Sequence, residues 1–207
     1  MTTQIRLVRH PETMIPAGVC AGRMEVPLTA GGRAALPSLI IMAHAYGPDS
    51  IISSDADRCR ETALALSQPL ALPVTLDTDW REIDFGQWEG RPWEDIEQED
   101  PAGYWDWMEH FDQVAPPGGE SFHLLQARVV RALETLITRG GRHLVVTHAG
   151  PIRAALAWVE NRPLRQAYEV QVPYSSVFDL IHQDGKWERI PYFYPAPYRQ
   201  ENGGVPK

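Results

Sequence analysis

The sequence predicts an α/β protein, a three-layer α/β/α sandwich with a mostly parallel central sheet and a small helical insertion. Two patterns lead to this prediction. Short apolar runs typical of buried strands alternate along the chain with longer segments whose apolar residues recur every three or four positions. Such alternation is typical of parallel sheets, because the helix that connects two parallel strands covers one face of the sheet.

The chain begins with a predicted strand and a loop that leads into a helix. Residues 4–9 are predicted to form a buried strand. After a loop rich in proline and glycine, Thr29 is placed to cap a helix of about fifteen residues that runs toward His44. Pro37 lies inside this helix and should bend or split it, because proline lacks the N–H that a helix interior needs.

Three strands and two helices are predicted in the middle of the chain. Residues 51–55 contain a second strand and its polar end, residues 57–66 a helix, and residues 74–76 a short third strand. The clearest helix spans residues 121–138, where apolar side chains recur at helical spacing. A pair of glycines ends it. Residues 143–147 then form another buried strand.

The C-terminal part of the chain is predicted to contain a helix and a hairpin. The helix follows the strand at 143–147 directly and runs through Trp158. Two short strands at 177–181 and 187–190 are joined by a turn at Asp184 and Gly185, a dipeptide typical of tight hairpins. From Tyr192 onward the chain is rich in Pro, Gly and Tyr, and we expect a draped or mobile tail.

The whole chain, residues 1–207, is expected to form one domain. Residues 84–120 differ from the rest because they concentrate tryptophan and proline. We expect short helices here, inserted as a lid over the candidate active site.

The composition excludes several classes of protein. The formal net charge is −8, so a nucleic-acid partner is not expected. Mean hydropathy is −0.31 and no apolar run approaches the ~20 residues of a membrane helix. No secretory signal is visible, so we expect a cytoplasmic protein. Two cysteines, Cys20 and Cys59, are too few for a zinc site or a disulfide framework.

Basic side chains lie at the carboxyl ends of the predicted strands. Arg9 and His10 end the first strand, Arg58 follows the second within one helical turn, and His148 comes directly after the strand at 143–147. Each alone is also typical of a solvated or capping residue. Because parallel strands place their carboxyl ends at one edge, the four groups are expected to converge, with the imidazoles about 4 to 7 Å apart.

Two arginines and two histidines around one point form a site for a dianion such as a phosphoryl group. A neutral His10 could attack phosphorus, while Arg9, Arg58 and a protonated His148 hold the oxygens as charge develops. The leaving oxygen needs a proton donor, for which Glu82 is the best candidate. A solvated loop carboxylate or an ion pair with a neighbouring arginine is the alternative for Glu82.

Six segments, taken together and in order, resemble the histidine phosphatase (phosphoglycerate mutase-like) superfamily over nearly the whole chain. They are residues 7–13 (family LVRHGET), 22–29 (GxxDxPLT), 53–63 (SSxxxRxxxTA), 82–90 (ExxFGxWEG), 117–121 (PGGES) and 146–150 (VTHGG). The resemblance implies that His10 accepts the phosphoryl group and Glu82 is the acid. It implies that Arg9, Arg58 and His148 complete the phosphate pocket, with no metal and no cofactor.

This sequence departs from the family pattern beside His10. Pro11 replaces the usual glycine and lacks the N–H that a glycine would carry. Pro16 stands where many members carry an asparagine of the phosphate pocket. One donor is therefore missing, and Thr13 or Arg23 is expected to replace it. Ala149 stands for a glycine after His148 and is expected to bind substrate through its backbone.

The resemblance favours the alpha-ribazole phosphatase and broad-specificity phosphatase branch. Between residues 88 and 120, Arg91 is the one cation among many Asp and Glu residues, which disfavours a substrate with a second acidic group. The tryptophans of this segment could stack on the flat base of alpha-ribazole 5'-phosphate, or they could pack the insertion onto the core.

The function expected from these observations is metal-independent hydrolysis of a small phosphomonoester through a phosphohistidine, with inorganic phosphate as product. Two alternatives stay open. The same fold could perform phosphoryl transfer of the phosphoglycerate mutase type. The departures at Pro11 and Pro16 could instead mark a non-catalytic module that binds a phospholigand. The sequence leaves a homodimer open.

Overall fold

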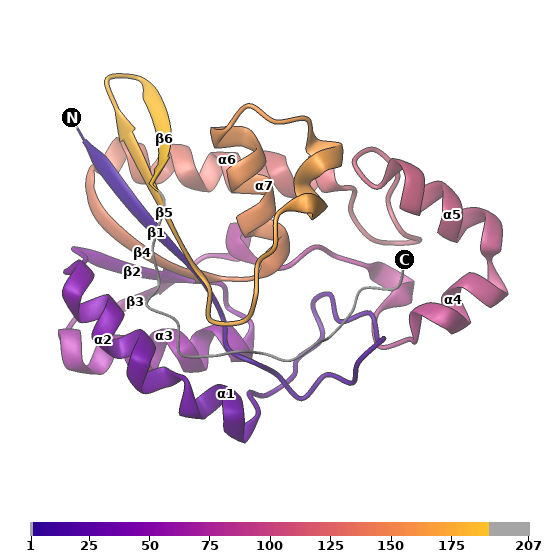
Figure 1. Ribbon diagram of the computed structural model, residues 1–207, viewed down its shortest axis with the longest axis horizontal. Coiled ribbons are helices and arrows are strands. Elements are labelled where there is room, and N and C mark those ends of the chain that lie inside the picture. The colour runs from indigo at the N-terminus through magenta and orange to yellow at the C-terminus, as the bar shows by residue number, and fades with distance from the viewer. Residues whose placement is uncertain (1, 191–207) are drawn as a thin grey trace.

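A six-stranded sheet forms the centre of the computed structural model, which describes residues 2–190 (Figure 1). The strand order is β3-β2-β4-β1-β5-β6. The four strands from β3 to β1 are parallel, whereas β5 runs antiparallel to β1 and β6 antiparallel to β5. The strands are β1 (Thr3–Arg9), β2 (Ser50–Ser53), β3 (Val74–Leu76), β4 (Gly141–Thr147), β5 (Val177–Gln183) and β6 (Lys186–Ile190).

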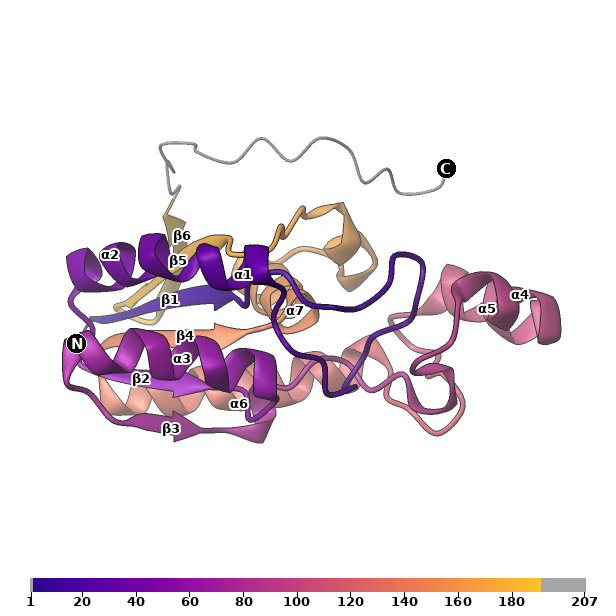
Figure 2. The same cartoon turned by 90° about the horizontal axis from the view of Figure 1, so that it is seen from below.

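Helices cover both faces of the sheet, which confirms the predicted three-layer sandwich (Figure 2). One face packs against α1, α2 and α3, and the other against α6 and α7. The helices, including the short 3-10 helices η1–η3, are α1 (Ala30–Ala34), α2 (Leu36–Tyr46), α3 (Asp57–Leu70), η1 (Thr78–Trp80), η2 (Gly86–Trp88), α4 (Trp93–Glu99), α5 (Pro101–His110), α6 (Phe122–Arg139), α7 (Ala149–Val159) and η3 (Leu164–Glu169).

The core consists of two layers, one on each side of the sheet, because successive strand residues point to opposite faces. In β4, Leu144 and Val146 are buried under α2 and α3. Val145 lies between them in sequence and is buried in the larger core under α6 and α7. Residues 144–146 of β4 are thus buried on both faces, which is the reason that they form an apolar run in the sequence.

Proline and capping side chains set the helix boundaries as expected. The Oγ1 of Thr29 accepts the Gly32 N–H at 2.8 Å and caps α1. The helix expected after Thr29 is split, since α1 ends at Ala34 and α2 begins at Leu36 with Pro37 in its first turn. Helix α3 continues to Leu70, beyond the expected end at residue 66. Gly140 ends α6 with a φ of 65°.

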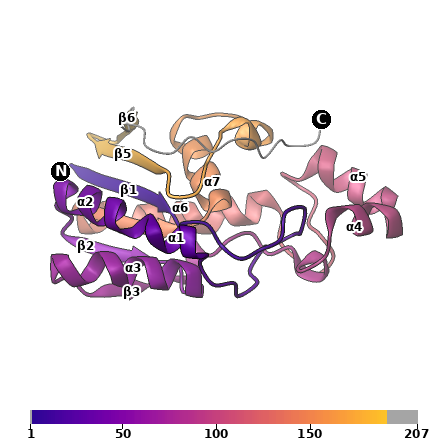
Figure 3. The ribbon, with the colours of Figure 1, turned by 60° about the horizontal axis from the view of Figure 1, so that its bottom comes forward.

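The segment at residues 84–120 contains η2, α4 and α5, which extend sideways from the sandwich (Figures 1 and 3). Trp88 and Trp107 are buried, and the rings of Trp93 and Trp107 stack with centroids 5.7 Å apart. These rings pack the segment onto the core, so they are not free to stack on a ligand base, contrary to one of the two expectations from the sequence.

None of the helices in residues 2–190 combines the length and apolar character that a membrane-spanning helix requires. The tail from Tyr192 onward, for which a draped or mobile arrangement was expected, lies outside the described residues.

Candidate active site

A cavity of about 120 Å³ lies at the carboxyl ends of the parallel strands β1 and β4. Parallel α/β sheets bind ligands at this edge. One wall is apolar and includes Ile15, Val26 and Phe85. The polar wall consists of Arg9, His10, Thr13, Arg58, Glu82 and Tyr174. Most of the candidate residues named from the sequence therefore lie around one small space.

His10 has one ring nitrogen committed to the backbone. Its Nδ1 lies 2.7 Å from the carbonyl oxygen of Pro11. A carbonyl oxygen only accepts hydrogen bonds, so Nδ1 carries the proton and Nε2 keeps its lone pair. Burial, together with the positive charges of Arg9 and Arg58, holds the pKa of His10 well below its usual value. The ring is therefore neutral at neutral pH, as a nucleophile requires.

Pro11 thus replaces glycine without loss of the group that orients His10. Proline lacks a backbone N–H but keeps its carbonyl, and the carbonyl is what holds the Nδ1 of His10. The side chain of Thr13 lines the cavity nearby and is buried, with 6% exposure. Pro16 is exposed. Of the two side chains expected to supply a replacement donor, Thr13 is in place to do so.

His148 is fully buried beside His10, with ring centroids 5.1 Å apart, within the expected range. Its Nδ1 accepts the Nε–H of Arg58 at 3.2 Å, so the proton of the neutral ring is on Nε2. That nitrogen lies 2.9 Å from the Oγ of Ser54. Burial and the charge of Arg58 hold the pKa of His148 well below its usual value. The ring is neutral here, which differs from the protonated His148 expected from the sequence.

The two arginines are held differently. Arg58 donates through Nε to His148, through Nη1 to the Met24 carbonyl at 2.6 Å and through Nη2 to the Gly22 carbonyl at 2.8 Å. A guanidinium has five N–H groups, so two remain for an anion in the cavity. Arg9 donates from Nη1 to the Val172 carbonyl at 2.5 Å. Its buried Nε has no hydrogen-bond partner among the described residues.

Glu82 is fixed by the backbone of the helix that follows His148. The N–H of Gly150, in the first turn of α7, donates to both carboxylate oxygens of Glu82, at 3.0 and 3.3 Å. The carbonyl of Glu82 accepts from Arg23 Nε at 3.2 Å and from Arg128 Nη2 at 2.9 Å. The carboxylate therefore lines the cavity from a loop that is tied down on both sides.

His148, Arg23 and Ala149 do not line the cavity, although the sequence analysis named all three. The guanidinium of Arg23 donates to Asp84, to Glu120 and to the Glu82 carbonyl, so two carboxylates already compensate its charge. Ala149 opens α7 directly after His148 and is buried. In the structure Arg23 thus holds the loop of Glu82.

The expected lid contributes one side chain to the cavity, Phe85. The rings of Trp93 and Trp107 lie 5.4 and 5.6 Å from that of Phe85 and support it from behind. Helices α4 and α5 provide none of the cavity-lining residues, so the acidic residues of this segment act on a ligand only from a distance.

Tyr174 is the residue that the sequence analysis missed. It lies in the loop before β5 and its ring centroid is 3.9 Å from the guanidinium carbon of Arg9 and 5.6 Å from the ring centroid of His10. No motif marks it. A topological signal exists, since β5 is antiparallel to β1 and therefore begins at the edge where β1 ends.

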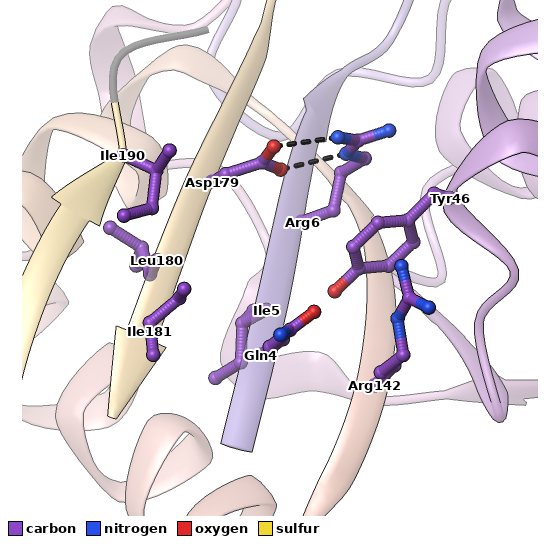
Figure 4. Close-up of a pocket in the computed structure, with 9 residues that line it drawn as sticks. All are labelled: Gln4, Ile5, Arg6, Tyr46, Arg142, Asp179, Leu180, Ile181 and Ile190. Atoms are coloured by element: carbon purple, nitrogen blue, oxygen red, sulfur yellow. Dashed lines mark hydrogen bonds and ion pairs between the residues drawn. The ribbon is translucent and has the colours of Figure 1, made fainter. Parts of the chain in front are cut away.

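A second cavity, of about 230 Å³, lies at the other end of β1 (Figure 4). Arg6 makes two hydrogen bonds to the carboxylate of Asp179, at 2.7 and 2.6 Å, and also lies against the ring of Tyr46. The ion pair compensates the charge of Arg6, and no histidine lines this cavity. Its chemistry does not match that of the cavity at His10.

A model of the histidine phosphatase superfamily (branch 1) matches residues 5–191. The chain is 30% identical over 169 residues to the adenosylcobalamin/alpha-ribazole phosphatase of Escherichia coli K12, with 80% of this chain and 83% of the relative covered. The structure of a putative alpha-ribazole-5'-P phosphatase from Escherichia coli K-12 aligns with a TM-score of 0.86 at 25% identity, over 96% of this chain and 99% of that chain. A mycobacterial glucosyl-3-phosphoglycerate phosphatase in complex with VO3 aligns with a TM-score of 0.79 at 25% identity, over 91% and 97%.

The family match extends from β1 to beyond β6 and so includes every element around the cavity. The fold agrees with that of the putative alpha-ribazole-5'-P phosphatase, of which 99% aligns. The chain therefore belongs to the histidine phosphatase superfamily and is an enzyme of the phosphatase type.

Proposed function

We propose that this enzyme hydrolyses small phosphomonoesters without a metal ion, through a phosphohistidine on His10. The observation that carries the proposal is the hydrogen bond from Nδ1 of His10 to the Pro11 carbonyl, which leaves Nε2 with its lone pair at the cavity wall. The depressed pKa of His10 keeps that lone pair available at neutral pH.

In the first step Nε2 of His10 attacks phosphorus, the N–P bond forms and the bond to the leaving oxygen breaks. Glu82 gives its proton to that oxygen, since an alkoxide leaves poorly. Arg9 and Arg58 hold the phosphoryl oxygens, and His148 positions Arg58 by accepting its Nε–H. In the second step water attacks phosphorus, Glu82 takes its proton and the N–P bond breaks.

The proposed substrate class is a monoester with a leaving group that has no further acidic group, and alpha-ribazole 5'-phosphate is the proposed example. The name of the Escherichia coli relative supports this choice. The apolar wall of Ile15, Val26 and Phe85 suits an apolar leaving group. The vanadate complex of the mycobacterial phosphatase supports a phosphate-like ligand for the cavity.

The decisive experiment is turnover of p-nitrophenyl phosphate in EDTA, together with trapping of the phosphoenzyme. We expect activity in EDTA and an acid-labile phosphoenzyme that is absent in His10→Ala. Full activity of His10→Ala would exclude the mechanism, and loss of activity on chelation would indicate a metallohydrolase. Phosphate binding without turnover in the wild-type protein would indicate the non-catalytic module.

A substrate panel separates the finer alternatives. Alpha-ribazole 5'-phosphate should have a higher kcat/KM than 3-phosphoglycerate, glucosyl-3-phosphoglycerate or fructose 2,6-bisphosphate. Interconversion of phosphoglycerates faster than hydrolysis would establish the mutase alternative. The cytoplasmic location expected from the sequence stays a prediction. The same holds for the possible homodimer.

A further inference from the structure

The loop at residues 172–176, between η3 and β5, is bonded to the backbone of the catalytic strand end. The Arg9 N–H donates to the Ser176 carbonyl at 3.0 Å, and the Ser175 N–H donates to the His10 carbonyl at 3.3 Å. The loop closes on itself through the Ser176 N–H and the Pro173 carbonyl at 3.1 Å. Any side chain that this loop presents is therefore held at a fixed place relative to Arg9 and His10.

Two groups of this loop hold the guanidinium of Arg9. The Val172 carbonyl accepts from Nη1 at 2.5 Å and fixes one edge of the guanidinium. The ring of Tyr174 lies under its central carbon, 3.9 Å from carbon to ring centroid, within the range of a cation–π contact. The hydrogen bond to the Val172 carbonyl fixes the position of the guanidinium, and the ring of Tyr174 fixes the orientation of its plane.

The backbone of the loop forms a tight turn at Tyr174. Ser175 has a φ of 60°, in the left-handed region that residues other than glycine rarely adopt. In the described part of the chain three other such residues occur, and they lie at ordinary positions, Ala71 and Asn161 at helix ends and Asp184 in the hairpin turn. Ser175 is the third residue of the turn that the Ser176 N–H closes on the Pro173 carbonyl, and a positive φ at that position is the geometry of a type II turn. The turn therefore fixes the place of Tyr174 in the loop.

Arg9 also has an unused donor. Its Nε is buried and has no hydrogen-bond partner among residues 2–190. Arg9 lines the cavity, and the N–H groups that the Val172 carbonyl does not engage are the donors that it keeps for a phosphoryl oxygen. Because a guanidinium is planar, the direction of these N–H groups follows from the plane that Tyr174 fixes.

We propose that Tyr174 is a positioning residue, whose aromatic ring holds the Arg9 guanidinium in the orientation that binds the phosphoryl group. This inference rests on the proposed function, because it assumes that Arg9 binds phosphate in this cavity. The ring acts through its face and not through the hydroxyl. Phenylalanine should therefore replace tyrosine at this position, whereas an aliphatic side chain of similar bulk should not.

The test is the dissociation constant of inorganic phosphate, measured by calorimetry on the full chain, together with kcat and KM for p-nitrophenyl phosphate. Tyr174→Leu should weaken phosphate binding and raise KM about tenfold, with a smaller change in kcat. Tyr174→Phe should stay within about twofold of the wild type. Pentafluorophenylalanine at position 174 keeps the shape of phenylalanine but inverts its ring quadrupole, so it should behave like leucine.

Two controls separate positioning from a merely structural role. In an Arg9→Met background, Tyr174→Leu should have no further effect on phosphate affinity, because the cation that the ring holds is gone. Tyr46→Leu removes a ring from beside Arg6 at the other end of β1 and should leave phosphate affinity unchanged. Thermal unfolding of each variant reports on its stability.

Several outcomes would overturn the proposal. Equal losses in Tyr174→Phe and Tyr174→Leu would mean that the hydroxyl binds phosphate directly. Wild-type affinity in the leucine or pentafluorophenylalanine variant, or additive effects in the Arg9→Met background, would mean that the ring does not act through Arg9. Failure of the proposed function gives a different result, namely a wild-type protein that binds phosphate but does not turn over p-nitrophenyl phosphate.

Discussion

The backbone N–H of Gly150 donates to both carboxylate oxygens of Glu82, 3.0 and 3.3 Å away. These residues are far apart in the sequence, and the contact joins the loop after η1 to the first turn of α7. His148 directly precedes this helix. One helix start therefore sets the position of the proposed acid and of the buried histidine beside the nucleophile.

Gly150→Ala should displace the carboxylate of Glu82. A Cβ at this position would lie 2.1 Å from Oε1 of Glu82, and Leu125 closes the space on another side at 3.2 Å. We expect kcat for alkyl phosphates to fall by about 10²-fold, since a small misplacement of a catalytic group has effects of this size. Gly185→Ala is the control, because nothing lies within 4 Å of its Cβ and only its φ of 74° is strained. Equal activity of the two variants would show that the Gly150 contact is unimportant.

Glu82→Gln should separate substrates by their leaving groups. Glutamine keeps an oxygen that can accept the Gly150 N–H but cannot give a proton to the leaving oxygen. Hydrolysis of an alkyl phosphate should fall by about 10² to 10⁴-fold, the usual contribution of a general acid. Hydrolysis of p-nitrophenyl phosphate, whose leaving group needs no proton, should fall much less. A uniform loss on both substrates in steady-state assays would assign Glu82 another role.

Arg128→Met should destabilise the fold and loosen the Glu82 loop. Arg128 is buried and pairs with Glu120 through Nη2 at 2.6 Å. Nη2 also donates to the Glu82 carbonyl, and Nη1 donates to the carbonyls of Asp79 and Arg81. Loss of one partner from a buried pair costs about 3–5 kcal/mol. Urea unfolding of Arg128→Met should show a loss of this size.

The same helix offers a matched control for Arg128. Arg131 is exposed and its ion pair with Asp79 spans 3.1 Å at the surface. Arg131→Met should change the free energy of unfolding by less than about 1 kcal/mol. If both variants lost the same stability, the buried network around Glu120 would not be what holds this loop.

The two neutral histidines should make the fold sensitive to acid. Burial depresses the folded-state pKa of His10 and His148 below that of an unfolded histidine, about 6.5. Below that pH the unfolded chain binds protons that the folded chain does not, so this stability is present above pH 6.5 and is lost as the pH falls. The loss approaches about 1.4 kcal/mol per pH unit for each histidine. Urea unfolding should be measured at several pH values between 6.5 and 5.5. The free energy of unfolding should fall less steeply with decreasing pH in His10→Gln than in the wild type. An equally steep fall in both proteins would contradict the depressed pKa of His10.

Local patterns were sufficient to place most of the elements. The apolar run that ends at Arg9 is β1, and the run that ends at Thr147 is β4. Thr29, Pro37 and Gly140 act where the chemistry of capping, proline and glycine predicted. These features depend on neighbours within one or two turns, so a sequence reports them directly.

Contacts between distant segments decided the rest of the candidate site. The guanidinium of Arg23 is engaged by Asp84 and Glu120, which no spacing in the sequence indicates. Trp88 and Trp107 are buried in the main core, to which they join the segment at residues 84–120. Tyr174 reaches Arg9 because β5 returns antiparallel beside β1.

The sequence by itself therefore determined the fold class, the family and the strand ends at which Arg9, His10 and His148 stand, because these follow from short-range periodicity and motif order. Only the tertiary structure decided that both imidazoles are neutral, that the Pro11 carbonyl takes Nδ1 of His10 and that Tyr174 lies against Arg9. The burial of a side chain and the charges around it depend on every segment that packs against it, so a local sequence pattern does not predict its pKa.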